Sequence, residues 1–207
     1  MIYRDRLHAG TLLSKKLLSL RAPNTVVVGL ARGGVVVAHE LAKAMSVPLD
    51  VLVVKKIGAP HNPELALGAM APDGVSVIDW RMAHLVGTDE DYINSQSSLL
   101  EDEIRQKTLL YRKGKKPLVV REKTVILVDD GVATGATLEA AIKWLRKKKA
   151  YSIIVAVPVA PPEVVVKVKP ETDDCIVLQE PEDLVAVGQF YEHFEQIEDA
   201  DVIHLLR

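Results

Sequence analysis

The side chains with the clearest chemistry in this sequence follow a short apolar run in its second half. Two adjacent carboxylates, Asp129 and Asp130, come directly after Thr124–Val128. The loop after them is Gly131-Val132-Ala133-Thr134-Gly135-Ala136-Thr137. Glycines let a backbone approach a ligand closely. Free amide groups at a helix start, together with the two threonine hydroxyls, form an anion site suited to a phosphate.

Two carboxylates beside a phosphate would repel it unless they serve another part of the ligand. They fit sugar hydroxyls, which donate hydrogen bonds to carboxylate oxygens, or a metal ion that is reached through water. We therefore expect this loop to bind a phosphorylated sugar accompanied by Mg²⁺. The competing interpretation is an ordinary strand, turn and helix with a solvated Asp pair, which requires four loop features to coincide by chance.

A second glycine-rich loop follows the first apolar run, with the sequence Gly29-Leu30-Ala31-Arg32-Gly33-Gly34. On its own this loop is a weak signal. The loop nearly matches a dinucleotide-binding fingerprint, and this is the only support for a nucleotide-dependent oxidoreductase. Ala31 stands where the second glycine should be, and the next apolar run ends in Lys55-Lys56 instead of an acid. A solvated arginine at a glycine-rich helix start is the other interpretation.

The elements that must position these loops alternate between two kinds of segment. Continuous apolar runs predict strands that are covered on both faces, as in a parallel sheet. The clearest are Thr25–Leu30, Leu49–Val54, Thr124–Val128 and Ser152–Val157, and Cys175–Leu178 is the last plausible one. Segments with helical spacing lie around 9–20, 37–45, 93–111 and 138–145. This alternation predicts an α/β fold with a Rossmann-like parallel sheet and helices on both faces, whose ligands bind at the carboxyl ends of the strands.

Two regions interrupt this alternation. Residues 55–87 are rich in Gly, Pro, His and Asn, which predicts a loop or a small antiparallel excursion. Residues 179–207 are acidic, and they are too few for a domain and too many for a tail. We therefore expect one domain with a core over 1–178 and a small C-terminal lobe over 179–207 that folds back over the sheet.

The amino-acid composition limits the classes of protein to which this chain can belong. The 207 residues are 48% hydrophobic and 26% charged with a net charge of −2, a balance typical of a globular protein and unlike a basic nucleic-acid-binding protein. The single cysteine, Cys175, cannot form an internal disulfide or a zinc cluster. There is no apolar leader and no run of 18 apolar residues. We therefore expect a cytoplasmic protein without a nucleic-acid or membrane partner.

The Asp129–Thr137 segment, with four hydrophobic residues before it, is similar to the signature of type I phosphoribosyltransferases. These enzymes bind phosphoribosyl pyrophosphate (PRPP). The resemblance implies their fold, with the C-terminal lobe as a hood over the acceptor. It implies that Asp129 and Asp130 face the ribose 2- and 3-hydroxyls and that residues 131–137 cradle the 5-phosphate. It also makes Ala31, Arg32, Gly33 and Gly34 the pyrophosphate loop, and Mg²⁺ the ion carried with PRPP.

In this family a mobile loop after the second strand closes over the leaving pyrophosphate. Lys55, Lys56 and His61 would supply positive charge there, although a solvated strand end explains the lysines equally simply. The stretch from Lys55 to Ala69, taken with the two loops, resembles a bacterial and archaeal branch of the family. The likeness continues to 188–194.

The sequence departs from better-known family members at two positions near the acceptor. Leu184, Val185 and Ala186 precede Val187-Gly188, where many members carry an aromatic residue that stacks on the base. Phe190 or Tyr191 would substitute for it, or both are core residues. Ala133 stands where hypoxanthine-guanine enzymes carry an acid, which makes this loop more similar to adenine or uracil enzymes.

The resemblance implies transfer of 5-phosphoribosyl from PRPP to a nucleobase-like acceptor, with release of pyrophosphate. Arg32, Lys55, Lys56, Asp129 and Asp130 are the residues expected to act in the transfer. A PRPP-binding regulatory protein with little or no catalysis is the alternative. Family resemblance also implies a homodimer.

Overall fold

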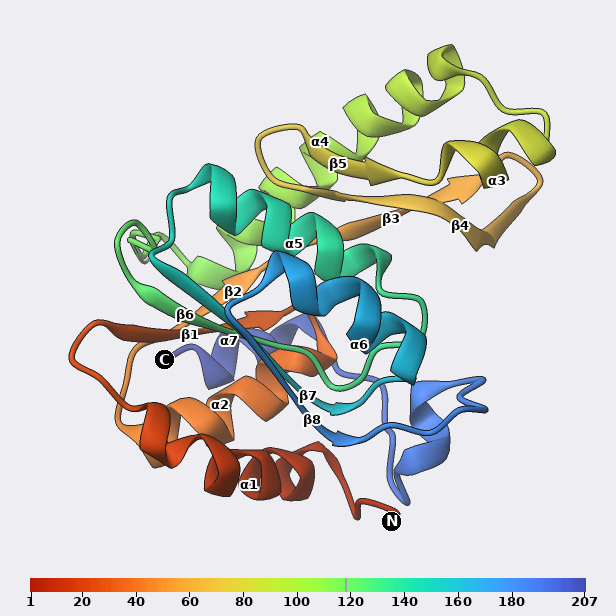
Figure 1. Cartoon of the computed structure of the whole chain (residues 1–207). Helices are drawn as coiled ribbons and strands as arrows, with labels where there is room; N and C mark the ends of the chain where they lie inside the picture. The colour runs from red at the N-terminus through yellow and green to blue at the C-terminus, as the bar shows by residue number, and fades with distance from the viewer. Residues whose placement is uncertain (118) are drawn as a thin grey trace.

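The core of the molecule is a five-stranded parallel sheet with the strand order β2-β1-β6-β7-β8 (Figure 1). The computed structural model describes residues 1–117 and 119–207. The strands are β1 (Thr25–Leu30), β2 (Leu49–Leu52), β6 (Thr124–Val128), β7 (Ser152–Val159) and β8 (Asp174–Gln179). All five apolar runs are therefore strands of one parallel sheet, and the predicted fold class is confirmed.

Helices cover both faces of this sheet (Figure 1). One layer holds α1 (Arg6–Leu17) and α2 (Gly33–Met45), and the other holds α5 (Ala136–Lys147) and α6 (Pro162–Val168). Strand β6 shows why its apolar run is continuous. Ile126 and Val128 pack with α1 and α2, whereas Val125 and Leu127 pack with α5 and α6. Successive side chains of a strand point to opposite faces, so both must be apolar.

The strand register brings the two chemically interesting loops together. Strand β1 pairs with β6 up to Gly29 and Val128, and with β2 up to Leu30 and Leu52. The carboxyl ends of β1 and β6 are therefore neighbours at one edge of the sheet. The loops that leave them start side by side.

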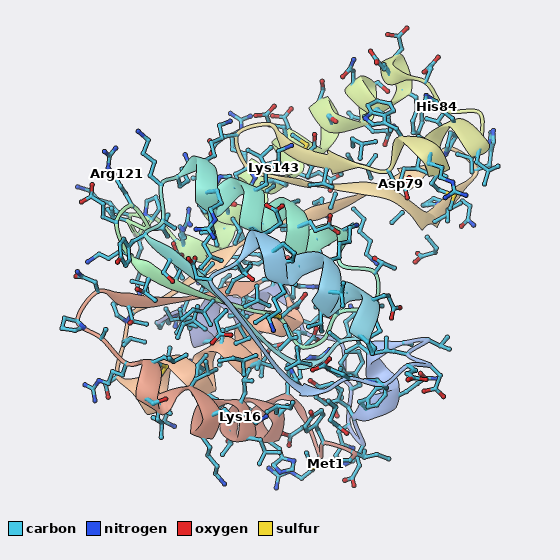
Figure 2. All side chains as sticks on the ribbon, viewed as in Figure 1. Met1, Lys16, Asp79, His84, Arg121 and Lys143 are labelled. Atoms are coloured by element: carbon cyan, nitrogen blue, oxygen red, sulfur yellow. The ribbon has the colours of Figure 1, made fainter. Side chains whose placement is uncertain are left out.

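The excursion after β2 is a small antiparallel lobe. Its sheet contains β3 (Lys55–Ala59), β4 (Asn62–Ala71) and β5 (Val75–Ile78), in that order. Of the two predicted alternatives, a loop or an antiparallel excursion, the structure contains the second, and a short helix, α3 (Trp80–Leu85), which was not expected, follows it. The lobe projects from the core, and Figure 2 shows its residues Asp79 and His84 on the opposite side of the molecule from Lys16.

A long helix, α4 (Glu90–Arg112), returns the chain from this lobe to the core. Its N-terminus is capped by Asp89, whose side chain accepts a hydrogen bond of 2.9 Å from the amide of Tyr92. Arg112, at its C-terminal end, forms an ion pair of 2.8 Å with Asp50 of β2. Both ends of α4 are thus fixed. None of the described helices has the length and apolar character that crossing a bilayer requires.

The C-terminal segment folds over the carboxyl edge of the sheet and then leaves it. After β8, the 3₁₀ helix η3 (Val187–Phe190) leads to an extended stretch, which meets the start of the chain. The amide of Tyr3 donates to the carbonyl of Phe190 at 2.8 Å, and the amide of Glu192 donates to the carbonyl of Tyr3 at 2.8 Å. The last helix, α7 (Asp199–Leu205), packs against α2 and α4. Two further 3₁₀ turns are η1 (Leu18–Leu20) and η2 (Lys169–Glu171).

Candidate active site

The two glycine-rich loops meet at the Asp pair. A β-carbon built on Gly33 would lie 1.9 Å from Oδ2 of Asp130. One built on Gly34 would lie 2.8 Å from Oδ1 of Asp129. No side chain fits at either position, because ordinary contacts between non-bonded carbon atoms are about 3.5–4.0 Å. The loop at residues 31–34 and the acidic pair, which lie almost 100 positions apart in the chain, are therefore in direct contact.

The carboxyl group of Asp129 has an unusual environment. Oδ1 of Asp129 accepts a hydrogen bond of 2.9 Å from the amide of Asp130. Burial raises the pKa of Asp129 well above its usual range, and the neighbouring charge of Asp130 raises it further. The positive charge of Arg6 acts in the opposite direction and lowers the pKa of Asp129. Folding therefore favours the protonated form of Asp129.

Arg6 is a site residue that the sequence analysis missed. Its Nε donates to Oδ2 of Asp130 at 2.7 Å, and its Nη1 donates to the carbonyl of Glu195 at 2.8 Å. The guanidinium also lies over the ring of Phe194, 3.8 Å from the ring centre. A local signal existed, because Arg6 lies on the buried stripe of α1 with Ala9 and Leu13. A charged residue on such a stripe indicates a partner elsewhere in the fold.

The loop from 131 to 137 has the features of a phosphate cradle. Gly135 has a φ of +83°, a left-handed conformation that glycine adopts at no steric cost, and α5 starts directly after it. Within the described part of the chain, the amide groups of residues 133–137 have no hydrogen-bond acceptor. Thr134 is exposed and Thr137 is half-buried. Five unpaired amide groups at the positive end of a helix dipole suit an anion.

The loop after β1 offers a second group of free donors. The amide groups of Arg32, Gly33 and Gly34 also have no acceptor among the described residues. The peptide bond between Ala31 and Arg32 is cis. The Arg32 side chain is half-exposed, and its Nη1 lies 3.8 Å from Oε2 of Glu198, just before α7. An exposed pair this long is weak. Arg32 therefore has a partner that an anionic ligand would displace.

The two lysines lie at the base of the antiparallel lobe. Nζ of Lys55 forms an ion pair of 2.9 Å with Oε2 of Glu103 on α4. Lys56 is exposed and has no ion pair with any described residue. His61 lies in the turn between β3 and β4. The described contacts join none of these three side chains to the loops at 31–34 or 129–137, so the structure does not bring them into the site.

The aromatic residues of the C-terminal segment divide into core and surface. Tyr191 is buried, and its hydroxyl donates to the backbone carbonyl of Asp130 at 2.5 Å. Burial raises the pKa of Tyr191, and the charge of Asp130 adds to this effect. Phe190 packs in the same small cluster. Phe194, which the sequence analysis did not single out, is 39% exposed and contacts both Arg6 and Gly188. Its ring centre lies 5.0 Å from that of Tyr191, so Phe194 packs on both Arg6 and Tyr191 while part of it stays exposed.

The structure also has a cavity that lies away from the two glycine-rich loops. A cavity of about 520 Å³ opens between β2, the second half of α4 and the C-terminal end of α5. Its wall includes Val51, Ile104 and Trp144, and none of the residues expected to bind a ligand. The donor atoms at the carboxyl edge of the sheet, and not this cavity, therefore identify the candidate active site.

Comparison with known proteins identifies the family. A model of the phosphoribosyl transferase domain matches residues 2–194. The chain belongs to the phosphoribosyl transferase domain family. The match includes both loops of the candidate site, and it ends at Phe194, before α7.

Relatives of this phosphoribosyl transferase domain extend the comparison. A Mycobacterium tuberculosis (strain H37Rv) protein, provisionally named a phosphoribosyl transferase, is 38% identical over 208 residues. The alignment covers 99% of this chain and 46% of that protein, so the chain spans about half the length of the curated relatives it matches. The crystal structure of the protein TT1426 from Thermus thermophilus shares 40% identity and superimposes with a TM-score of 0.82, covering 100% of this chain and 98% of that one.

A more distant structure shows the fold alone. The purine phosphoribosyltransferase from Pyrococcus horikoshii is 22% identical, with a TM-score of 0.50 over 93% of each chain. This structure confirms the fold that the resemblance to type I phosphoribosyltransferases implied, and the family model and the curated relative confirm the family.

Proposed function

We propose that this protein transfers the 5-phosphoribosyl group of PRPP to a ring nitrogen of a nucleobase-like acceptor and releases pyrophosphate. The observation that carries this proposal is the contact of Gly33 and Gly34 with the side chains of Asp130 and Asp129. It places donors for a diphosphate and acceptors for sugar hydroxyls next to each other. PRPP presents those two groups on adjacent carbons of one molecule.

In this reaction the bond between C1 of the ribose and the pyrophosphate oxygen breaks, and a bond from C1 to the acceptor nitrogen forms. The acceptor nitrogen loses its proton, and pyrophosphate leaves with the bonding electrons. Positive charge develops at C1 and the ring oxygen, so positioning and electrostatics supply the catalysis. Amide groups 133–137 would hold the 5-phosphate, and Arg32 with its neighbouring amide groups would take the leaving charge.

Mg²⁺ fits this site as an ion carried by the ligand. The described residues contain no cluster of three or more His, Cys, Asp or Glu side chains that would hold a metal by themselves. A magnesium ion normally keeps several waters and binds substrate phosphates, with few protein ligands. When bound, it would neutralise charge on the leaving pyrophosphate.

The acceptor side of the site is formed by the C-terminal segment. A planar base would pack against the exposed part of Phe194, whose ring also contacts Arg6 and Tyr191. Ala133 leaves no charge at the position where hypoxanthine-guanine enzymes carry an acid. We therefore propose a planar, nitrogenous acceptor. The homodimer stays a prediction that light scattering after gel filtration tests.

The first test is calorimetric titration of PRPP with Mg²⁺ into wild-type protein, Asp130→Asn and Asp183→Asn. Asp183 is an exposed acid of the same C-terminal segment and serves as the control. We expect wild type and Asp183→Asn to bind alike and Asp130→Asn to bind about tenfold more weakly, because a hydrogen bond to a charged acceptor is lost. If a folded wild-type protein did not bind PRPP, the proposal would be wrong.

A screen for pyrophosphate release across nucleobases then separates the enzyme from the regulatory alternative. Release with one base and PRPP supports transfer. Tight PRPP binding without release for any base supports a PRPP-binding regulatory protein.

A further inference from the structure

We propose that Arg6 is a positioning residue for the ribose, which holds the carboxylate of Asp130 in the orientation that receives the sugar hydroxyls. The inference rests on the proposed function. It adds a residue from the N-terminal helix, outside both loops, to the binding site.

Three contacts fix the Arg6 guanidinium from three directions. Nε bonds Asp130, Nη1 bonds the carbonyl of Glu195, and the flat face rests on Phe194. The side chains of Arg6 and Asp130 are only 10% and 15% exposed. A pair this well covered is screened little by solvent, so it holds a defined geometry in a way that surface pairs do not.

The pair also leaves room for a ligand at Asp130. Arginine and a carboxylate frequently form two parallel hydrogen bonds, which occupy both carboxylate oxygens. Here only Oδ2 of Asp130 receives the guanidinium, because Nη1 is directed to Glu195. Oδ1 is not covered by Arg6. The arginine thus fixes the rotation of the carboxylate without closing it to a hydroxyl donor.

The charge of Arg6 serves the same purpose. A carboxylate accepts hydrogen bonds from hydroxyls when it is ionised, and the charge of Asp130 disfavours the ionisation of Asp129. The groups that face the pair are Arg6, and on the hood side Tyr191 with Tyr3 behind it. Arg6 is the only cation among these three. Its removal would leave two neighbouring acids without a compensating charge.

Lysine would replace this arrangement only in part. An ammonium group keeps the charge but has no planar fork, so it cannot bond Asp130 and Glu195 while stacking flat on Phe194. We therefore expect Arg6→Lys to restore part of what Arg6→Gln loses. Arg4, which is exposed and paired with Asp5, provides a matched control two residues away.

The experiment compares the affinities of wild type, Arg6→Gln, Arg6→Lys and Arg4→Gln for three probes. The probes are ribose 5-phosphate, 2-deoxyribose 5-phosphate and pyrophosphate. We expect Arg6→Gln to bind ribose 5-phosphate about tenfold more weakly and to lose the preference for ribose over deoxyribose. Pyrophosphate affinity should be unchanged, and Arg6→Lys should lie between Arg6→Gln and wild type. Arg4→Gln should match wild type throughout.

If Arg6 had only a structural role, Arg6→Gln would bind all three probes more weakly by a similar factor and would keep the preference for ribose over deoxyribose. That result would overturn the proposal. If Arg6→Gln bound ribose 5-phosphate as tightly as wild type does, the proposal would also be wrong. Binding of ribose 5-phosphate and pyrophosphate by the wild-type protein would still support the proposed function. If Arg6→Gln does not fold, the same comparison is made with Arg6→Lys.

A ligand-free measurement separates failure of the proposed function from failure of this inference. In ¹³C NMR of the side-chain carboxyls, Asp129 should titrate at higher pH in Arg6→Gln than in wild type, because the cation that lowers its pKa is gone. If this pKa shift is observed but the protein does not bind PRPP, Arg6 is still the ionic partner of the Asp pair, and its proposed role in binding ribose is wrong. An unchanged titration would discard the role of Arg6 itself.

Discussion

Gly33 lies against Asp130 so closely that a β-carbon on the glycine would be 1.9 Å from Oδ2 of the acid and 2.9 Å from Nε of Arg6. The loop at residues 31–34 therefore rests directly on the ion pair between Arg6 and Asp130, which joins the proposed diphosphate and ribose subsites. Any side chain at position 33 must push these groups apart. The geometry of the two subsites is accordingly shared.

Gly33→Ala should reduce PRPP affinity by about tenfold or more, since the added methyl group displaces either Asp130 or the loop. Calorimetry measures the loss, and a thermal melt shows whether the protein still folds. Gly74→Ala is the contrasting change. Gly74 lies in the turn before β5 with a φ of +68° and open space around it, so alanine there should cost about 1 kcal/mol of stability and leave PRPP binding intact. Equal PRPP affinity in Gly33→Ala and wild type would refute the shared geometry.

Asp129→Asn should change how stability depends on pH. Because the pKa of Asp129 is raised in the folded protein, folding favours its protonated form. Protonated Asp129 therefore contributes to the free energy of unfolding of wild type. This contribution is fully present at a pH below the ordinary pKa of a carboxyl group, and it is lost as the pH rises through the raised pKa. Asparagine cannot ionise and does not show this loss. Each unit by which the pKa is raised corresponds to about 1.4 kcal/mol.

Urea unfolding at a series of pH values measures the difference. The stability of Asp129→Asn relative to wild type should increase from pH 4 upwards. A difference that stays constant with pH would mean that Asp129 ionises normally in the folded protein.

The two lysines of the lobe should not contribute equally to transfer. Lys55 is paired with Glu103 at 2.9 Å, whereas Lys56 has no ion pair among the described residues. If the lobe closes over the pyrophosphate, the unpaired charge is the one available to it. Lys56→Ala should therefore lower kcat several-fold, with a smaller effect for Lys55→Ala. Steady-state rates of pyrophosphate release decide between them, and the reverse order would assign the role to Lys55.

Tyr191→Phe should destabilise the protein by about 1 kcal/mol, the usual net contribution of a hydrogen bond. Its buried hydroxyl bonds the carbonyl of Asp130 at 2.5 Å, and phenylalanine would leave that carbonyl without this donor. Tyr151→Phe is the matched control, because Tyr151 is 77% exposed. Urea unfolding of the two variants should separate them. Equal stabilities would indicate that water replaces the lost donor.

The parallel sheet was predictable because each strand carries its own local signal. Continuous runs such as Thr124–Val128 need apolar partners on both faces, and the structure provides them. The loop at 129–137 was equally accessible, since its residue types follow one another in the chain. The small helices α3, α6 and α7 have no more than seven residues each, too few for a helical period to stand out.

Contacts between distant segments could not be predicted in the same way. Arg6 and Asp130 are 124 positions apart, and Tyr3 meets Phe190 across almost the whole chain. Phe194 was missed because its role depends on the arginine that stacks on it. Lys55 was expected in the site on the basis of charge and position, but Glu103 of α4 provides a partner that only the fold reveals. Pairings between remote residues depend on tertiary structure, which a local pattern does not contain.

The pairing of residues 3–4 with residues 190–193 also bears on how the protein is synthesised. The ribosome makes Arg6 well before Tyr191 and Glu195, because 189 positions separate Arg6 from Glu195. A nascent chain can form the first strands of the sheet long before the groups that surround Asp130 are complete. The acidic pair is therefore assembled late, and truncated or stalled chains would carry it unfinished, with the first helix still lacking its partner.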